Sequence, residues 1–93
     1  MDGIVIAGDY KGKNISRVWT KDPNKLFRIE LGLFKDLFLN KETVASLEFV
    51  QYNGVDLARG KTTVWASITF RDGKRSLISM SEKDYQKLQI ALY

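Results

Sequence analysis

The stretch VWASITFRDGKRSLISM, residues 64–80, decides the fold. Its first half has the period-two pattern of a half-buried strand, with Val64, Ala66, Ile68 and Phe70 on one face and Trp65, Ser67, Thr69 and Arg71 on the other. Asp72-Gly73 follows and predicts a type I′ hairpin turn, which needs residues that tolerate positive φ. A second β-like run at 76–80 completes the hairpin.

Five further strands are predicted upstream of this hairpin, at 4–7, 15–20, 26–31, 34–39 and 45–50. Turn residues separate them near 11–14, 22–25, 40–43 and 53–60, and Gly32 interrupts the run between the third and fourth strands. Such regular spacing is typical of an antiparallel meander. Trp19 in the second strand is expected to lie in or next to the core.

The sequence changes character after Met80. Ser81 suits a helix N-cap, Asp84 stands at the third helical position, and Met80 and Tyr85 can form a hydrophobic staple. The apolar residues that follow share one face of a helix: Tyr85, Leu88, Ala91 and Leu92. We therefore predict a helix over about 82–92, which is so short that it must dock on the sheet to be stable.

These elements predict a mainly β (α+β) architecture, in which a seven-stranded antiparallel barrel or sandwich is capped by a C-terminal helix. A chain of 93 residues is too short for two independent cores, so a single domain over 1–93 is expected.

Three segments resemble small bacterial and phage proteins with a pleckstrin-homology-like (PH-like) domain, of Gram-positive type. They are GDYKGKNI at 8–15, LFLNKETVASLEF at 37–49 and ITFRDGKRSLISMSEKDYQKLQIALY at 68–93. The resemblance implies a PH-like fold more than an activity, since these relatives are mostly uncharacterised. Such relatives often have a glycine-rich apolar insert between the fifth and sixth strands. Here 53–61 is short and polar, so a membrane contact through that insert is not expected.

The composition excludes several kinds of chemistry. With no cysteine and no histidine, the chain cannot form disulfides, Ser–His or Cys–His nucleophilic pairs, or the usual zinc sites. No carboxylate pair or nucleotide-binding motif stands out, so we expect no catalytic residues, no metal and no cofactor. The only apolar run near the start, at 4–7, is too short for a signal peptide, so a cytoplasmic location is expected.

The predicted partner-binding surface centres on Trp65. Its strand pattern places Trp65 on the face opposite the core residues, where an exposed Trp beside Arg71 has the composition of an interaction hot spot. Tyr52 and Val50, on the outer face of their strand, are expected to extend this surface, with Arg59 and Lys61 nearby in the sequence. In the alternative interpretation, Trp65 is a partly buried side chain that packs under the C-terminal helix or a neighbouring loop.

A second candidate site surrounds the first turn, where Lys11, Lys13 and Arg17 could hold an anion. Basic residues around this turn are similar to those that hold inositol phosphates in lipid-binding PH domains. The alternative interpretation is an ordinary solvated turn.

Three functional hypotheses follow. The first is a non-catalytic interaction module with a protein partner or self-association, for which a regulatory or phage–host role is conceivable. The second is a single-stranded nucleic-acid-binding domain that uses Trp65 and the basic stretch 59–75. The third, anionic lipid headgroup binding at Lys11, Lys13 and Arg17, ranks below both, because a membrane partner is the least expected.

Overall fold

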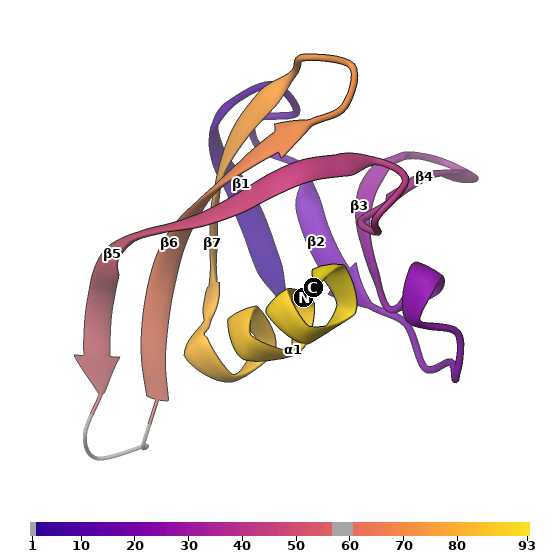
Figure 1. Cartoon of the computed structure of the whole chain (residues 1–93). Coiled ribbons are helices and arrows are strands. Elements are labelled where there is room, and N and C mark those ends of the chain that lie inside the picture. Colours follow the sequence, from indigo (N-terminus) through magenta and orange to yellow (C-terminus); the bar gives the residue numbers. More distant parts are fainter. Residues whose placement is uncertain (1, 57–60) are drawn as a thin grey trace.

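The computed structural model describes residues 2–56 and 61–93, whose strands form one seven-stranded antiparallel sheet (Figure 1). The strands are β1 (Gly3–Gly8), β2 (Asn14–Arg17), β3 (Phe27–Gly32), β4 (Lys35–Phe38), β5 (Val44–Asp56), β6 (Lys61–Phe70) and β7 (Arg75–Ser81). Their order in the sheet is β4-β3-β2-β1-β7-β6-β5, so β4 and β5 are its edges. The helix α1 (Glu82–Leu92) follows β7 directly, and a 3₁₀ turn (Pro23–Lys25) precedes β3.

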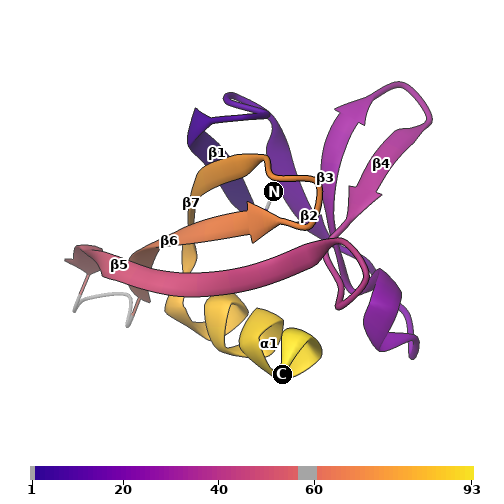
Figure 2. The ribbon, with the colours of Figure 1, turned by 45° about the horizontal axis from the view of Figure 1, so that its top comes forward.

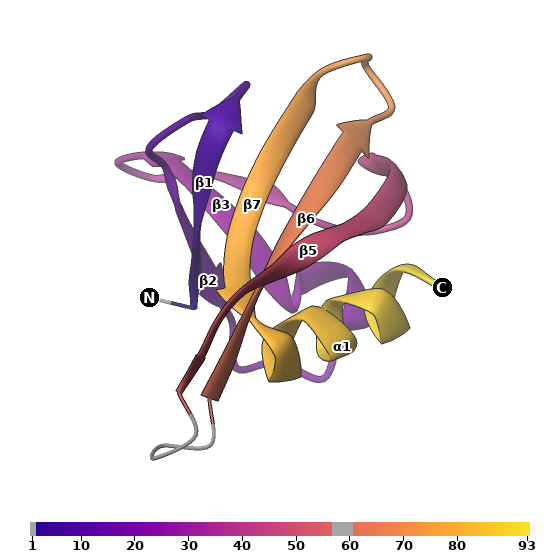
Figure 3. The ribbon, with the colours of Figure 1, turned by 90° about the vertical axis from the view of Figure 1, so that its left-hand side faces the viewer.

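The sheet curls around one core and has the plan of a PH-like sandwich capped by a helix, which confirms the predicted fold class. Figure 3 shows α1 lying against one end of the curled sheet, and Figure 2 shows the β3–β4 hairpin projecting away from β5. β1, β3, β6 and β7 contribute alternate side chains to the core, as a half-buried sheet requires. The fully buried members include Val5, Ile15, Phe27, Ile29, Ile68, Ile78 and Leu88.

The helix begins where the sequence predicted. Ser81 Oγ accepts the Asp84 N–H at 3.1 Å, which satisfies one of the free amides of the first turn. The predicted apolar face is buried, and it consists of Tyr85, Leu88, Ala91 and Leu92. Tertiary packing of this face stabilises a helix of only eleven residues.

The β6–β7 hairpin is present, but the predicted type I′ turn is wrong. Gly73 has φ +92°, whereas Asp72 is not among the residues with positive φ. Gly73 N–H donates to Phe70 O at 3.0 Å, and Phe70 N–H donates to Lys74 O at 2.8 Å. The turn therefore has three residues, 71–73, with glycine in the left-handed position at its end.

The turn between β1 and β2 is tied to the start of β7. Asp9 accepts the Arg75 N–H through its carboxylate at 2.9 Å, and Ser76 Oγ donates to Asp9 O at 2.6 Å. Gly8 has φ +82°, and a Cβ atom there would lie 2.5 Å from Arg75 O. Glycine is thus required at position 8 both for its φ and for the close approach of β7.

The turn between β4 and β5 is organised by Asn40, which is buried. Its Oδ1 accepts the N–H groups of Glu42 at 2.8 Å and Thr43 at 3.1 Å. Its Nδ2 donates to Asn24 O at 3.0 Å and so links this turn to the 3₁₀ turn. The short connection predicted at 40–43 is confirmed.

Trp19 is fully exposed, so the expectation that it lies in or near the core is wrong. β2 ends at Arg17, two residues before Trp19, so strand alternation no longer determines the direction of the Trp19 side chain. Val18 N–H donates to Leu26 O at 2.7 Å, and Val18 is the half-buried member of the pair.

Candidate partner-binding groove

Trp65 lies on the outer face of the sheet, as its strand pattern predicted. Its cross-strand neighbours are Gln51 on β5 and Ser79 on β7. Val64 and Ala66, on either side of it, belong to the core on which α1 packs. Trp65 is therefore on the face opposite α1 and is not covered by it, yet most of its surface is buried.

Tyr52 lies on the other face of the sheet from Trp65, which corrects the surface expected to join them. Phe49 pairs with Ala66 and Gln51 pairs with Trp65, so Val50 is an extra residue between them. This β-bulge shifts the alternation of β5 by one position. Tyr52 consequently pairs with buried Val64 and faces α1.

The basic residues predicted around Trp65 do not gather at one place. Lys61 and Phe70 lie at opposite ends of β6, whose ten residues span about 30 Å, and Arg71 follows Phe70. Arg71 Nε donates to Lys41 O at 2.8 Å and supports the turn before β5. Arg59 lies outside the described residues.

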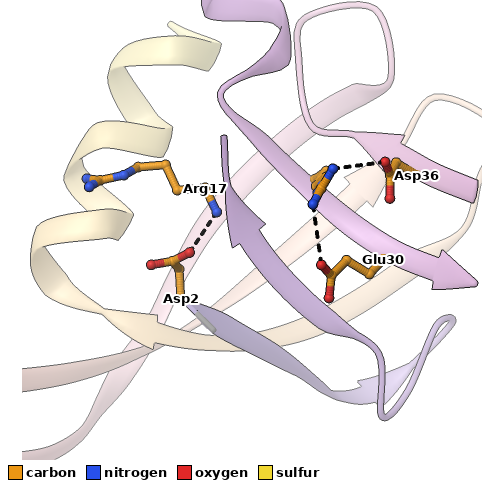
Figure 4. Close-up of polar contacts among 5 residues, drawn as sticks. Asp2, Arg17, Glu30 and Asp36 are labelled. Carbon is orange, nitrogen blue, oxygen red and sulfur yellow. Dashed lines mark hydrogen bonds and ion pairs between the residues drawn. The ribbon is translucent and has the colours of Figure 1, made fainter. Parts of the chain in front are cut away.

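The three residues of the predicted anion site are likewise separated. Lys11 and Lys13 are exposed at the β1–β2 turn, whereas Arg17 is at the far end of β2. There the backbone N–H of Arg17 donates to the Asp2 carboxylate at 2.7 Å, as Figure 4 shows. Its guanidinium lies 3.6 Å from the carboxylate of Asp84 on α1. Arg17 therefore links the strands to the helix instead of joining the lysines.

Arg28, which lies beside Lys13 near the β1–β2 turn, is also paired with acids. The guanidinium of Arg28 on β3 lies 3.1 Å from the Asp36 carboxylate and 3.5 Å from that of Glu30 (Figure 4). These two acids offset its charge. The surface beside Lys13 is therefore less basic than the count of lysines and arginines indicates.

The sheet face that carries Tyr52 forms a groove with α1. The groove has a volume of about 200 Å³ and is lined by Phe49, Tyr52, Val64, Glu82, Tyr85, Gln86 and Gln89. β5 supplies an aromatic wall, and the stripe of α1 facing it supplies a polar wall with one acid.

Aromatic rings line the β5 side of this groove. The ring centroids of Phe49 and Tyr52 are 5.1 Å apart in an edge-to-face arrangement, and Phe49 lies 6.4 Å from Tyr85. Phe49 is 47% exposed and Tyr52 is 59% exposed, whereas Tyr85 at the base is buried. Burial raises the pKa of the Tyr85 hydroxyl, with a smaller contribution from nearby Tyr93.

A separate contact joins β5 to the residue after α1. Leu47 N–H donates to Tyr93 Oη at 3.0 Å, and Tyr93 Oη–H donates to Leu47 O at 3.3 Å. Both backbone groups of Leu47 therefore point to the edge of β5 that faces away from β6. Most of the Tyr93 side chain is exposed.

Apolar exposure among the described residues is concentrated along these two elements. Five of the eight exposed large apolar side chains lie on β5 or at the end of α1, namely Phe49, Val50, Tyr52, Ile90 and Tyr93. The others are Trp19 and the adjacent pair Leu33 and Phe34. Of these side chains, Phe49 and Tyr52 line the groove, and an exposed aromatic pair beside a free strand edge is typical of an interaction site.

The sequence contained one signal for this groove that the strand assignment missed. Phe49 and Tyr52 are three residues apart, which is incompatible with a shared face in a regular strand. Their aromatic character on either side of Val50 and Gln51 was compatible with a bulge, but only the pairing with β6 locates it.

Two larger hollows lie elsewhere on the described surface. One, of about 640 Å³, lies at the start of α1 and includes Asp2, Lys61, Glu82 and Lys83, whose charges are of mixed sign. The other, of about 480 Å³, lies between the β1–β2 and β3–β4 turns and is lined in part by Lys13, Leu33 and Phe34. Among the described residues, no three His, Cys, Asp or Glu side chains come together as metal ligands.

Comparison with protein-family models, with curated proteins and with solved structures gives no match for this chain. No helix in 2–56 or 61–93 has the length and hydrophobicity needed to cross a membrane.

Proposed function

We propose that this protein is a non-catalytic interaction module that binds a protein partner in the groove between β5 and α1. The observation that carries the proposal is the exposed Phe49–Tyr52 pair, which lies next to the free edge of β5. Half-exposed aromatic side chains at the rim of a small pocket are the usual anchors of a protein interface.

The size and lining of the groove favour a side chain of a partner over a small molecule. Its volume of about 200 Å³ is below the usual range for drug-sized ligands, about 300–1,000 Å³. Glu82 is the one charged residue among those that line it. The best-fitting occupant is an extended peptide segment with an apolar side chain for the aromatic wall and a Lys or Arg beside Glu82.

The test is selection of binders from a displayed library of random peptides, followed by affinity measurements on single variants. Tyr52→Ser should weaken the selected peptides by about 30-fold, the effect of removing an interface hot spot. Trp19→Ser is the matched control, because it removes an exposed aromatic side chain that does not line the groove. Failure to select any peptide, or peptides that respond to Trp19→Ser and not to Tyr52→Ser, would refute the proposal.

A second candidate function, contact with an anionic membrane surface, is favoured by the β3–β4 turn. Leu33 is 87% exposed and Phe34 is 97% exposed, and both line a hollow together with Lys13. Phe34 also has φ +62°, a strained conformation for an aromatic residue. Lys35 follows this apolar tip in the sequence, and the acids of the hollow, Glu30 and Asp36, are paired with Arg28. An apolar tip beside basic residues left unpaired in the described part of the chain suits insertion between anionic headgroups.

Sedimentation with phosphatidylserine vesicles tests this candidate. Wild-type protein should sediment with the vesicles at low salt, and both Phe34→Ser and Lys13→Glu should reduce the bound fraction. Trp19→Ser again serves as the control. Absence of binding at low salt removes the candidate.

The nucleic-acid hypothesis receives less support. Stacking of bases needs an accessible ring, whereas most of Trp65 is buried and the Arg71 guanidinium donates to Lys41 O. The relation to small PH-like bacterial and phage proteins remains a proposal, supported by the order of seven strands and one helix. The cytoplasmic location expected from the short apolar run at 4–7 also stays a prediction.

A further inference from the structure

The contact between Tyr93 and Leu47 imitates a backbone pairing. In an antiparallel sheet, two residues of a hydrogen-bonded pair exchange both of their N–H···O bonds. Leu47 makes the same two bonds with a single hydroxyl, accepting from it at 3.3 Å and donating to it at 3.0 Å. Tyr93 Oη therefore stands where the backbone of an eighth strand would lie.

The edge of β5 is open to such a strand. β4, the other edge, has only four residues and carries Lys35 and Asp36, which discourage pairing with another chain. β5 has thirteen residues, and between Val44 and Val55 its only charged residue is Glu48. Unpaired edges of this kind add strands readily.

The side chains at this edge fit the same occupant. Backbone groups alternate in direction along a strand, so Phe49, two residues after Leu47, directs its N–H and C=O to the free edge as well. The Phe49 ring also lines the groove, 5.1 Å from Tyr52. In a strand that pairs with Leu47 and Phe49, the side chains on the α1 side of the sheet would therefore contact the aromatic wall.

We propose that the partner is an extended strand that adds to the free edge of β5, and that the Tyr93 hydroxyl holds the place of its backbone at Leu47 in the unbound protein. The inference rests on the proposed function, because it specifies how the groove between β5 and α1 is occupied. Binding requires Tyr93 to leave Leu47. Tyr93 is 72% exposed, so its departure sacrifices little buried surface, and the two hydrogen bonds are the main interaction lost.

The test compares Tyr93→Phe with the wild type. The substitution removes only the hydroxyl, and Tyr10→Phe is the matched control, since Tyr10 packs on Phe70 at a different part of the sheet. Peptides from the displayed library that respond to Tyr52→Ser should bind Tyr93→Phe about tenfold more tightly than wild type, because they no longer compete with two hydrogen bonds. Tyr10→Phe should leave their affinity unchanged.

Amide hydrogen exchange gives an independent readout without any peptide. In the wild type the Leu47 amide should be protected, and in Tyr93→Phe it should exchange faster while the core amides of β6 keep their protection. Addition of a selected peptide should restore the protection of Leu47 in the variant.

The outcomes separate the two proposals. Peptides that respond to Tyr52→Ser but bind wild type and Tyr93→Phe equally would overturn the role of Tyr93 and leave the groove as the binding site. Peptides insensitive to Tyr52→Ser would overturn both. Dimerisation of Tyr93→Phe through β5, measured by light scattering without peptide, would overturn the assignment of a separate partner, since a second copy would then supply the strand.

Discussion

Replacement of Leu88 with alanine tests the docking of α1, on which the groove depends. Leu88 is 0% exposed and belongs to the core shared by the sheet and the helix. Truncation of a fully buried leucine costs about 2–5 kcal/mol, from lost burial and from the cavity left behind. A domain of 93 residues has about 5–14 kcal/mol of net stability, so this one change should remove a large part of it.

Urea denaturation followed by Trp fluorescence measures the effect. We expect the midpoint to fall strongly while the slope of unfolding free energy against urea concentration stays the same, since the surface exposed on unfolding hardly changes. Ile90→Ala is the matched control, because Ile90 lies two residues further along α1 and is 79% exposed. Its free energy of unfolding should stay within about 0.5 kcal/mol of wild type.

The reasoning would be refuted if the two variants lost equal stability, or if Leu88→Ala were as stable as wild type. Either result would mean that α1 does not pack on the sheet through Leu88. The groove between β5 and α1 would then lack its helical wall. If Ile90→Ala is as stable as expected, it can also serve as a control in the peptide-binding assays, because Ile90 does not line the groove.

Three further predictions concern the turns and the groove. Gly8→Ala should lower the thermal stability of the fold more than Gly12→Ala does. Both glycines have positive φ, which costs an alanine about 1–2 kcal/mol. Only at position 8 would the added Cβ also meet another strand, 2.5 Å from Arg75 O. Asn40→Ala should lower the unfolding free energy by about 1–3 kcal/mol in urea, because it leaves buried groups of the 40–43 turn without partners. The raised pKa of Tyr85 means that the folded state holds the proton of its hydroxyl more tightly than the unfolded state does. The free energy of unfolding should therefore be highest below a pH of about 10 and fall as the pH rises further. In a titration followed by tyrosinate absorbance, Tyr85→Phe should remove the part that appears at the highest pH.

The strands and the helix could be predicted because their signals are local. The alternation at 64–70 sets which side chains face the core, and Ser81 with Asp84 fixes the start of α1 within a few residues. These patterns depend on neighbours in the chain, and tertiary packing reinforced them. Trp65 was accordingly predicted on the correct face.

The candidate site depends on contacts between distant residues, and only the tertiary structure decided it. The extra residue Val50 arises from the pairing of β5 with β6, and it moves Tyr52 to the face opposite Trp65. The contact between Leu47 and Tyr93 joins residues 46 positions apart. A period-two pattern carries no information about where a partner strand inserts or skips a residue, so sequence alone gave the sheet but not the side of it on which the aromatic groove lies.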